Sequence, residues 1–587
     1  MATRAAPAFT IGVDFGTSSA RAVVIDVADG AALGTSVFDY PSGKGGVLLD
    51  DHDIHLARQN PGDYLAGLRA SITGALAAAE TADAGAGQAA RGFTRQRVIG
   101  VGVDTTGSTP LPVDAACRPL ALDPRFAGRA AAQAWLWKDH TGAAEAAAIT
   151  EAARRHAPQY LAPIGGTYSS EWFWSKIWRC LRDDPEVFGA AASWVELCDY
   201  IPAVLAGASD PRAIRRSVCA AGHKAMFSRA WGGLPSADFL ARLDPRLGEL
   251  RSRLYREADV SSGDRAAGAL GAEWSQRLGL PEGIAVALGG FDAHLGAVGA
   301  GIRAGTLVKI IGTSTCDIAI APAAGATSPG DIPGICGIVD GSVMPGYLGI
   351  EAGQSAVGDL LEWWAAGAGS AGAPAGGDAH VALTAAAARL APGQSGLVAL
   401  DWNNGNRTVL VDPRLTGLLV GQTLHTTRAE IYRALIEATA FGARAIIDRL
   451  RERGVPIERV VCCGGIAEKN DLFMQIYADV LARPMAIAGS SQTPALGAAL
   501  AAAVAAGPGA GGYATFEAAQ ARMTQPGARR FDPRPQAVAV YERLYGIYRE
   551  LHDLFGGVAH APGTPGAPDA ATLMKRLLAL REEQVSP

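Results

Sequence analysis

The chain has 587 residues, of which 49% are apolar, 19% are charged and 73 are glycine. This composition excludes a disordered chain, a coiled coil and a disulfide scaffold. The net charge of −5, with no lysine-rich tract, argues against nucleic acid and membranes as partners. The eight cysteines are scattered, and the N-terminus lacks an apolar signal core, so we expect a cytoplasmic protein. The Ala-rich stretch Leu496–Ala506 is too short to span a membrane and predicts a buried helix.

The first predicted element is a β-hairpin around a Gly-Thr-Ser-Ser turn. Residues Phe9–Asp14 form a short apolar run, and Ala20–Val27 is rich in strand-forming residues. Between these two runs lie Gly16, Thr17 and Ser18. Two strands joined by such a turn indicate an antiparallel pair.

A helix and two further strands are expected next. Asn60 offers an N-cap and Pro61 suits the first helical position, and apolar residues then follow at helical spacing. The run Val98–Asp104 is a continuous apolar strand that ends in an acidic residue. The aromatic run Trp172–Trp178 predicts core or interface packing rather than a ligand platform. Another strand, Ile284–Leu288, leads into the sequence GGFDAH.

A second copy of the hairpin begins at Leu307–Ile311. This run enters a turn formed by Gly312, Thr313 and Ser314, and it continues as the strand Cys316–Ala321. The two matched hairpins indicate two large domains of related topology, because a repeated device is the signature of a repeated fold unit.

The boundary between the two domains is expected just before the second hairpin. We therefore predict an N-terminal domain over residues 9–303 and a C-terminal domain over residues 304–510. Residues 511–587 are expected to form a C-terminal helical extension, with helices at Val538–Leu554 and Ala570–Glu583.

The second domain contains one strong helix start and one glycine turn. Residues 427–430 read Thr-x-x-Glu, a capping box at the start of a helix. The apolar run Val460–Cys463 predicts a buried strand that enters Gly464 and Gly465, and a helix is expected from about Glu468. This turn suits contact with a nucleotide, although a plain strand-to-helix turn has the same pattern.

Both Gly-Thr-Ser turns can present backbone N–H groups and hydroxyls to a polyanion, because glycine permits close approach to the backbone. One such turn is usually a plain hairpin, whereas two matched copies favour phosphate binding. The sequence has no GxxxxGK[ST] loop, and no GxGxxG follows a strand. These absences disfavour a Walker-type nucleotide site and a dinucleotide-dependent oxidoreductase.

Two aspartates stand at the ends of predicted strands, where α/β enzymes place reactive groups. Asp14 precedes the first turn and is either a ligand of Mg²⁺, acting through water, or an ordinary turn residue. Asp292 suits the carboxylate that accepts a hydroxyl proton in a kinase. His294 is interpreted as a packing or hydrogen-bonding residue. The charged loop 50–55, rich in aspartate and histidine, is expected to be solvated surface.

Several strings of the sequence resemble the FGGY family of carbohydrate kinases, a branch of the actin, hexokinase and heat-shock ATPase superfamily. Residues 417–421 read Gly-x-Leu-x-Gly, and the pattern continues at 430–437. Gln422 departs from the aliphatic residue that the family usually has there. The resemblance covers residues 11–506.

Within this family, seven longer segments resemble the ribulokinase branch. They are GVDTTGSTPLPVD (102–114), LWKDHT (136–141), YSSEWFWSKIW (168–178), RSVCAAGHK (216–224), GGFDAHLGAVGAG (289–301), IGTSTCD (311–317) and EAGQSAVGD (351–359). Several long and unusual strings in the same order make this resemblance specific.

The resemblance implies an α/β protein of two ribonuclease-H-like domains, of the actin/hexokinase type, with ATP and the sugar meeting in a cleft between them. Asp292 matches the general base of the family, and Asp14 matches the acidic residue near Mg²⁺. The two Gly-Thr-Ser turns match the phosphate loops. Gly464, Gly465 and Asn470 fall in the segment that usually lines the adenosine pocket.

For the sugar, the resemblance points to five residues, namely Thr106, Gly107, Lys224, Asp292 and Glu351. A polyol needs several charged or polar hydrogen-bonding groups, so their chemistry is suitable. Without the resemblance, Lys224 would be interpreted as an exposed lysine and Glu351 as a helix-start carboxylate. Trp137 and Asp139 are weaker candidates near the same cleft.

The activity that the resemblance implies is ATP-dependent phosphorylation of the terminal C5 hydroxyl of ribulose, with L-ribulose as the expected isomer and arabinose catabolism as its setting. The ligands would be a small-molecule sugar and MgATP. A kinase for D-ribulose, xylulose or ribitol and a noncatalytic ATP-binding sugar sensor are the alternatives. The aromatic run and the C-terminal helices are candidate surfaces for a homodimer.

Overall fold

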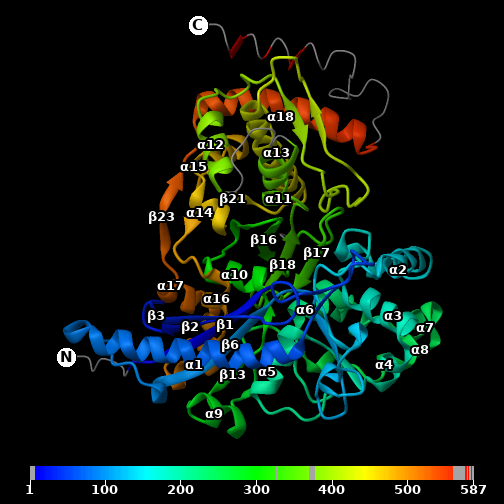
Figure 1. Ribbon diagram of the computed structural model, residues 1–587, viewed down its shortest axis with the longest axis vertical. Helices are drawn as coiled ribbons and strands as arrows, with labels where there is room; N and C mark the ends of the chain where they lie inside the picture. The colour runs from blue at the N-terminus through cyan, green and yellow to red at the C-terminus, as the bar shows by residue number, and fades with distance from the viewer. Residues whose placement is uncertain are drawn as a thin grey trace.

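The computed structural model describes residues 7–325, 328–368 and 377–558, together with residues 576, 577, 580, 583 and 584. The expected helix Ala570–Glu583 lies largely outside these residues. Two sheets with helices on their faces form the molecule, the N-terminal sheet in the lower half of Figure 1 and the C-terminal sheet in the upper half.

The first sheet confirms the N-terminal hairpin. Its order is β12-β13-β6-β1-β2-β3, with β14 paired to β6. The hairpin strands pair antiparallel from Phe9 with Asp26 to Phe15 with Ala20, and β6 joins β1 in parallel. The strands of this sheet are β1 (Phe9–Phe15), β2 (Ser19–Asp26), β3 (Ala32–Asp39), β6 (Val98–Thr105), β12 (Ala266–Ala269), β13 (Ala285–Ala287) and β14 (Gly290–Phe291).

The second sheet repeats the connectivity of the first. Its order is β17-β18-β16-β15-β21-β22-β23. From β18 to β23, the strand pairs are in turn antiparallel, antiparallel, parallel, parallel and antiparallel. The strand pairs of the first sheet, from β3 to β12, have the same sequence of directions. The strands are β15 (Gly305–Ile311), β16 (Thr315–Pro322), β17 (Gly337–Asp340), β18 (Tyr347–Ala352), β21 (Ile457–Cys463), β22 (Met485–Ala488) and β23 (Pro526–Phe531). The prediction of two halves with related topology is confirmed.

The segment after residue 510 was expected to be helical, and the structure shows a strand within it. β23 pairs antiparallel with β22 at the edge of the second sheet. Helix α18 (Pro535–Phe555) follows, and Tyr541, Leu544 and Tyr548 are buried in the core of the second half. The arginine-rich sequence of β23 gave no strand signal, because edge strands are often charged.

The predicted helix starts are confirmed at both places. Helix α1 (Pro61–Gly85) begins after Asn60, whose side chain accepts a hydrogen bond from the amide of Gly62. Helix α13 (Arg428–Glu452) begins with the full capping box between Thr427 and Glu430. The other helices of the second half are α11 (Gly358–Glu362), α12 (Gly377–Ala387), α14 (Gly465–Lys469), α15 (Asp471–Leu481) and α17 (Phe516–Met523).

A group of helices and short strands extends the first half on the right of Figure 1. The aromatic run lies at the start of α3, and Trp172, Phe173 and Trp174 are buried in the core of this group. The sequence predicted either core packing or interface packing for these aromatic residues. The three rings pack in the core, so they are not available for an interface. The helices of this group are α2 (Ala143–His156), α3 (Phe173–Asp183), α4 (Pro185–Ala190), α6 (Val218–Ala225), α7 (Ala237–Leu243) and α8 (Pro245–Arg251). Helices α5 (Leu197–Leu205) and α9 (Ala272–Leu278) pack instead in the core of the first sheet.

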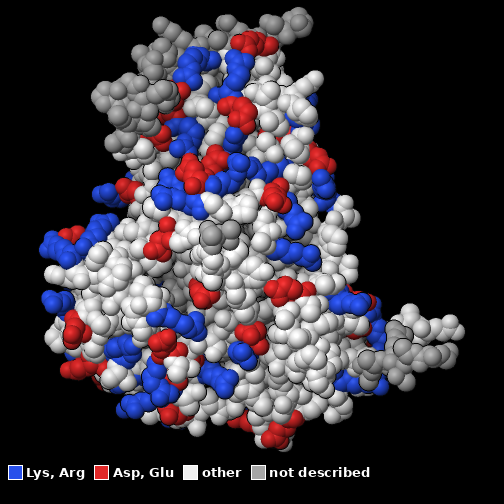
Figure 2. Space-filling view, turned by 180° about the vertical axis from the view of Figure 1, so that it is seen from behind, with Lys and Arg blue, Asp and Glu red and all other residues white. Residues whose placement is uncertain are grey.

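The surface mixes charges of both signs. Basic and acidic side chains are interspersed over the face shown in Figure 2. The charged loop 50–55 is largely exposed, as expected. Among the described residues, no helix combines the length and the apolar character needed to cross a bilayer.

Two helices lie between the sheets and join the halves. Helix α10 (Asp292–Gly299) packs on helix α16 (Thr493–Ala506), which also covers one face of the first sheet. Their apolar residues share one core with residues of β2, β15 and β16. The helix predicted at 496–506 is therefore buried, and the chain returns from the second half to cover the first sheet. The proposed division at residue 303 stays a prediction.

The contact between α10 and α16 is tight enough to predict a stability effect. A Cβ atom at Gly497 would overlap the carbonyl oxygen of Leu295, so Gly497→Ala should lower the free energy of unfolding by about 1–3 kcal/mol. Gly546→Ala is the control, because this exposed position on α18 has no atom near the added Cβ. It should be neutral or raise stability by up to about 1 kcal/mol. Thermal and urea unfolding measure both, and equal effects of the two variants would contradict the prediction.

Candidate active site

Three aspartates meet at the carboxyl ends of neighbouring strands in the first sheet. Because β6 is parallel to β1, Asp104 is the register partner of Asp14. β14 pairs with the end of β6, with Phe291 opposite Thr105, and Asp292 follows as the first residue of α10. This edge is where open α/β sheets bind their ligands. The structure thus brings two of the predicted residues together and adds a third.

Burial and like charge raise the pKa values of these carboxyls. Burial raises the pKa of Asp292 to about 7, and the neighbouring Asp14 carboxylate adds to the effect. For the same two reasons, the pKa of Asp104 lies well above its ordinary value. Burial also raises the pKa of Asp14, against the opposing effect of Arg21, whose guanidinium lies 3.5 Å away. A carboxylate that titrates near neutral pH is suited to accept a proton from a hydroxyl.

Asp14 and Asp104 also offer a donor set that fits Mg²⁺. Both carboxylate oxygens of Asp104 are buried and have no hydrogen-bond partner within the described structure. Carboxylate oxygens are the ligands that Mg²⁺ prefers, usually together with several waters. Asp104 was not among the predicted site residues, although it shows the same signal as Asp14, an acidic residue at the end of an apolar strand.

The first Gly-Thr-Ser turn adjoins these aspartates, between β1 and β2. The amide of Gly16 donates to the carbonyl of Ser19 at 2.9 Å, which closes the turn. Thr17 is half-buried, and its hydroxyl accepts a hydrogen bond from the indole of Trp137 at 3.1 Å. Ser18 is exposed at the tip. Trp137, a weaker candidate from the sequence, therefore orients the predicted phosphate turn.

The second turn, residues 312–314, lies between β15 and β16. Its first two residues are exposed, so their backbone groups are accessible to a ligand. Burial raises the pKa of Cys316, just beyond the turn, to about 12, and the charges acting on this thiol include Arg407, Glu351 and Asp292. Helix α10, which begins at Asp292, also contacts β16, the strand that follows this turn.

Two of the predicted sugar-binding residues form an ion pair with each other. Lys224 lies on α6 in the first half and Glu351 on β18 in the second, and the Lys224 Nζ is 2.9 Å from Glu351 Oε1. The Arg407 guanidinium lies 3.3 Å from the same carboxylate oxygen. Both residues of the pair are buried, so the alternatives of an exposed lysine and a helix-start carboxylate are wrong. The pair joins the two halves of the molecule.

Two buried histidines lie beside this ion pair. His223 Nε2 is 3.0 Å from His294 Nε2, and His223 Nδ1 is 3.4 Å from Glu351. Burial lowers the pKa of His294 to about 4 and that of His223 well below its ordinary value, so both rings are neutral at pH 7. His294 hydrogen-bonds as expected, whereas His223 was missed. His223, His294 and Glu351 lie close enough together to hold a metal ion. Lys224 and Arg407 already balance the charge of Glu351, which disfavours a metal cation there.

The predicted sugar loop follows β6 directly. The Thr106 hydroxyl lies 3.1 Å from that of Thr109, and Gly107 packs against the ring of Phe291, the residue before Asp292. Lys176 holds the same loop from beneath, because its buried Nζ donates to the carbonyl of Ser108 at 2.8 Å and to those of Trp135 and Leu136. Lys176 was missed, although it lies in the string YSSEWFWSKIW.

The predicted nucleotide residues adjoin the second turn through the sheet. β21 is parallel to β15, with Cys463 opposite Ile310, and Gly464 and Gly465 follow at the end of β21. Asn470 has a structural role as well, because its Oδ1 caps α15 by accepting from the amide of Phe473. Its Nδ2 donates to the Thr384 hydroxyl at 3.3 Å. The three residues stay predictions for the adenosine side.

Asp139, the other weaker candidate, has a structural role in the fold. It is fully buried, forms an ion pair with Arg58, and accepts a hydrogen bond from the amide of Ala57 at 2.7 Å. These contacts satisfy its charge, because a buried carboxylate is tolerated when it is paired and hydrogen-bonded.

Residues 307–506 match the C-terminal domain of the FGGY family of carbohydrate kinases. A ribulokinase from Shouchella clausii is 43% identical over 558 residues, which cover 93% of this chain and 95% of the relative. A ribulokinase from Mycolicibacterium smegmatis is 40% identical over 562 residues, or 94% of each chain.

Solved structures show the same fold. The xylulose kinase of Rhodospirillum rubrum superposes with a TM-score of 0.72 at 25% identity, over 93% of this chain and 99% of that one. The glycerol kinase of Plasmodium falciparum superposes with a TM-score of 0.68 at 14% identity, over 93% and 98%. The expected two-domain fold of the actin/hexokinase type is confirmed. With curated relatives above 40% identity along nearly its whole length, the chain belongs to the FGGY family of carbohydrate kinases, enzymes that phosphorylate sugars with ATP.

Proposed function

We propose that this kinase is a ribulokinase that transfers the γ-phosphoryl group of MgATP to the terminal C5 hydroxyl of L-ribulose, in arabinose catabolism. The position of Asp292 carries the proposal. It is a half-buried carboxylate with a pKa of about 7, at a strand end shared with Asp14 and Asp104. The identity of about 40% to ribulokinases supports ribulose as the sugar.

Asp292 accepts the hydroxyl proton while the sugar oxygen attacks the γ-phosphorus. The bond from that phosphorus to its bridging oxygen breaks, and ADP leaves with the electron pair. Lys224 and Glu351 orient the sugar hydroxyls, since each can exchange part of its mutual ion pair for a hydrogen bond to a polyol. Thr106 and Gly107 contribute from the loop beside Phe291.

The two Gly-Thr-Ser turns offer backbone amides and hydroxyls to the phosphates, from Gly16, Thr17, Ser18 and residues 312–314. Asp14 and Asp104 would hold Mg²⁺, which neutralises charge on the phosphates. Gly464, Gly465 and Asn470 would contact the adenosine. Closure of the two halves around the bound sugar would exclude water that would otherwise hydrolyse ATP.

The sugar preference is tested by sugar-dependent release of ADP. We expect the highest kcat/KM with L-ribulose and lower values with D-ribulose, xylulose and ribitol, because these sugars differ in hydroxyl orientation or in the keto group. A coupled assay across the four sugars, with a no-sugar control, measures this order. A higher kcat/KM with xylulose or ribitol would assign another member of the family's substrates, and no release with any sugar would favour the sensor.

Replacing the proposed base removes turnover and spares nucleotide binding. Asp292→Asn should lower kcat by about 10²–10⁴-fold, because the amide cannot accept the proton. Binding of MgATP, followed by calorimetry, should change little. Asp238→Asn is the matched control, since this aspartate is exposed on α7. Turnover of Asp292→Asn near that of the wild type would exclude Asp292 as the base.

The raised pKa of Asp292 predicts the acid limb of the pH profile. Protonated Asp292 accepts no proton, so kcat/KM should fall about tenfold per pH unit as the pH drops below about 7. Asp14→Asn removes the like charge that raises this pKa, so its residual activity should show an acid limb at lower pH. A wild-type limb near pH 4, or identical limbs in both proteins, would contradict the assignment.

A further inference from the structure

One neighbouring segment, residues 353–358, forms hydrogen bonds with the second Gly-Thr-Ser turn. Gln354 pairs with Thr315 at the end of the turn: the Thr315 amide donates to the Gln354 carbonyl, and the Gln354 amide donates to the Thr315 hydroxyl, both at 3.0 Å. Two further amides of the segment donate to carbonyls of the turn at 2.8 and 3.1 Å, from Val357 to Thr313 and from Gly358 to Gly312. The conformation of the turn therefore follows the position of this segment.

The side chain of Gln354 anchors the segment in the core. Its Oε1 accepts a hydrogen bond from Lys309 Nζ at 2.9 Å, and its Nε2 donates to Asp401 Oδ2 at 2.6 Å and to the carbonyl of Thr439 at 2.8 Å. Gln354, Lys309 and Asp401 are all buried. With both ends of the amide engaged, this side chain has one orientation.

Lys309 connects the Gln354 side chain to the second hairpin, because it bonds to both Gln354 and Asp317. It is the cross-strand partner of Asp317, and its Nζ lies 2.9 Å from both oxygens of that carboxylate. It also lies 3.3 Å from the Thr315 hydroxyl. The charge of Lys309 is balanced by Asp317, so the lysine contributes geometry rather than net charge beneath the turn.

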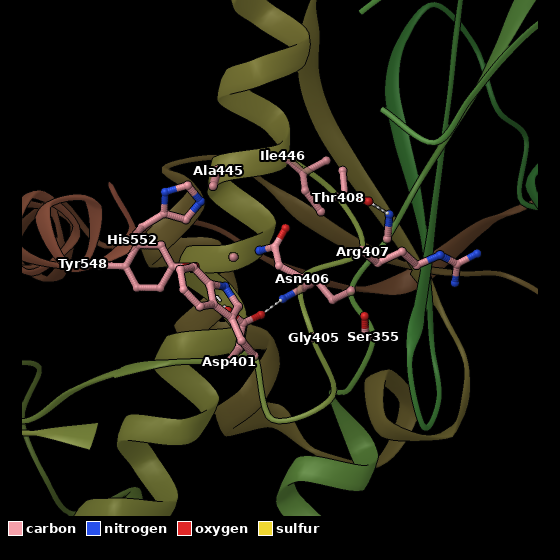
Figure 3. Close-up of a pocket in the computed structure, with 14 residues that line it drawn as sticks. Ser355, Asp401, Gly405, Asn406, Arg407, Thr408, Ala445, Ile446, Tyr548 and His552 are labelled. Carbon is pink, nitrogen blue, oxygen red and sulfur yellow. Dashed lines mark hydrogen bonds between the residues drawn. The ribbon is translucent and has the colours of Figure 1, made fainter. Parts of the chain in front are cut away.

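Asp401 is in turn held by the C-terminal helix. The hydroxyl of Tyr548 on α18 donates to Asp401 Oδ1 at 3.2 Å, opposite the bond from Gln354. Figure 3 shows Tyr548 reaching from α18 toward the Asp401 side, with the His552 ring directed toward Ala445. These residues line a cavity of about 10 Å³. Arg407 lines the same cavity, and in this view its guanidinium extends toward the second sheet.

We propose that Tyr548 is a positioning residue for nucleotide binding, which acts through Asp401 and Gln354 to fix the second phosphate turn. The inference rests on the proposed function, because it takes residues 312–314 as a binding site for ATP phosphates. It assigns the C-terminal helix a role in binding MgATP. Glu351 has further contacts that do not involve Tyr548, namely its ion pairs with Lys224 and Arg407 and the pairing of β18 with β16.

The test compares two tyrosines on the same helix. Tyr548→Phe removes only the hydroxyl that reaches Asp401, whereas Tyr545→Phe removes a hydroxyl that donates to Asp448. We expect Tyr548→Phe to raise the Kd for MgADP and the KM for MgATP about tenfold, with the KM for the sugar within twofold of the wild type. Tyr545→Phe should leave all three constants unchanged.

A second variant tests the route through Asp401. Asp401→Asn should weaken MgADP binding in the same way, and the double variant with Tyr548→Phe should be little worse than either single variant, because both break one chain of contacts. Thermal unfolding verifies that each protein is folded. Independent, additive effects would contradict the route through Asp401.

Four outcomes decide between the inference and the proposed function. Unchanged MgADP affinity in Tyr548→Phe and Asp401→Asn would overturn the inference, and so would an equal rise in the KM of the sugar. Gly312→Ala checks the turn directly: unchanged MgADP affinity in this variant would remove the phosphate turn, and the inference with it. A wild-type protein that binds MgADP but phosphorylates none of the four sugars would contradict the proposed function alone.

Discussion

The placement of the candidate base depends on the close contact between α10 and α16. Gly299 and Gly497 let the two backbones approach, because a Cβ at either position would overlap the opposite helix. Gly12 and Gly102 do the same where α16 covers β1 and β6. Since α10 begins at Asp292, this packing fixes the carboxylate at the ends of those two strands. The same helices carry the core that joins the halves, so the stability of the fold and the position of the candidate base depend on one contact.

The charged residues of the site form two groups, the three aspartates and the residues around Glu351, and their charges are balanced differently. Asp14, Asp104 and Asp292 lie together, with Arg21 beside Asp14, and their pKa values are raised. Burying carboxylates in this way costs free energy, and proteins tolerate it where a proton or a metal ion is to be bound. At the proposed sugar site, the nearby Lys224 and Arg407 hold the Glu351 carboxylate ionised. The three aspartates are therefore suited to accept positive charge, whereas Lys224, Glu351 and Arg407 are suited to donate and accept hydrogen bonds.

Local signals predicted local structure well. Both hairpins, the N-cap at Asn60 and the capping box at Thr427 follow from residues close together in the chain. The single helix expected from Glu468 is divided into α14 and α15, because Asn470 stops the first and caps the second. β23 could not be predicted in this way, since an edge strand is defined by its partner rather than by an apolar pattern.

The two matched halves, the two Gly-Thr-Ser turns and the aspartates at strand ends follow from the sequence alone, because strand periodicity and turn chemistry are encoded within a few residues. Three contacts depend instead on the three-dimensional packing: Lys224 pairs with Glu351, Asp104 lies beside Asp14, and the hydroxyl of Tyr548 reaches Asp401 in the core. These contacts join residues far apart in the chain. Their existence depends on how two sheets and their helices pack, which no local pattern specifies.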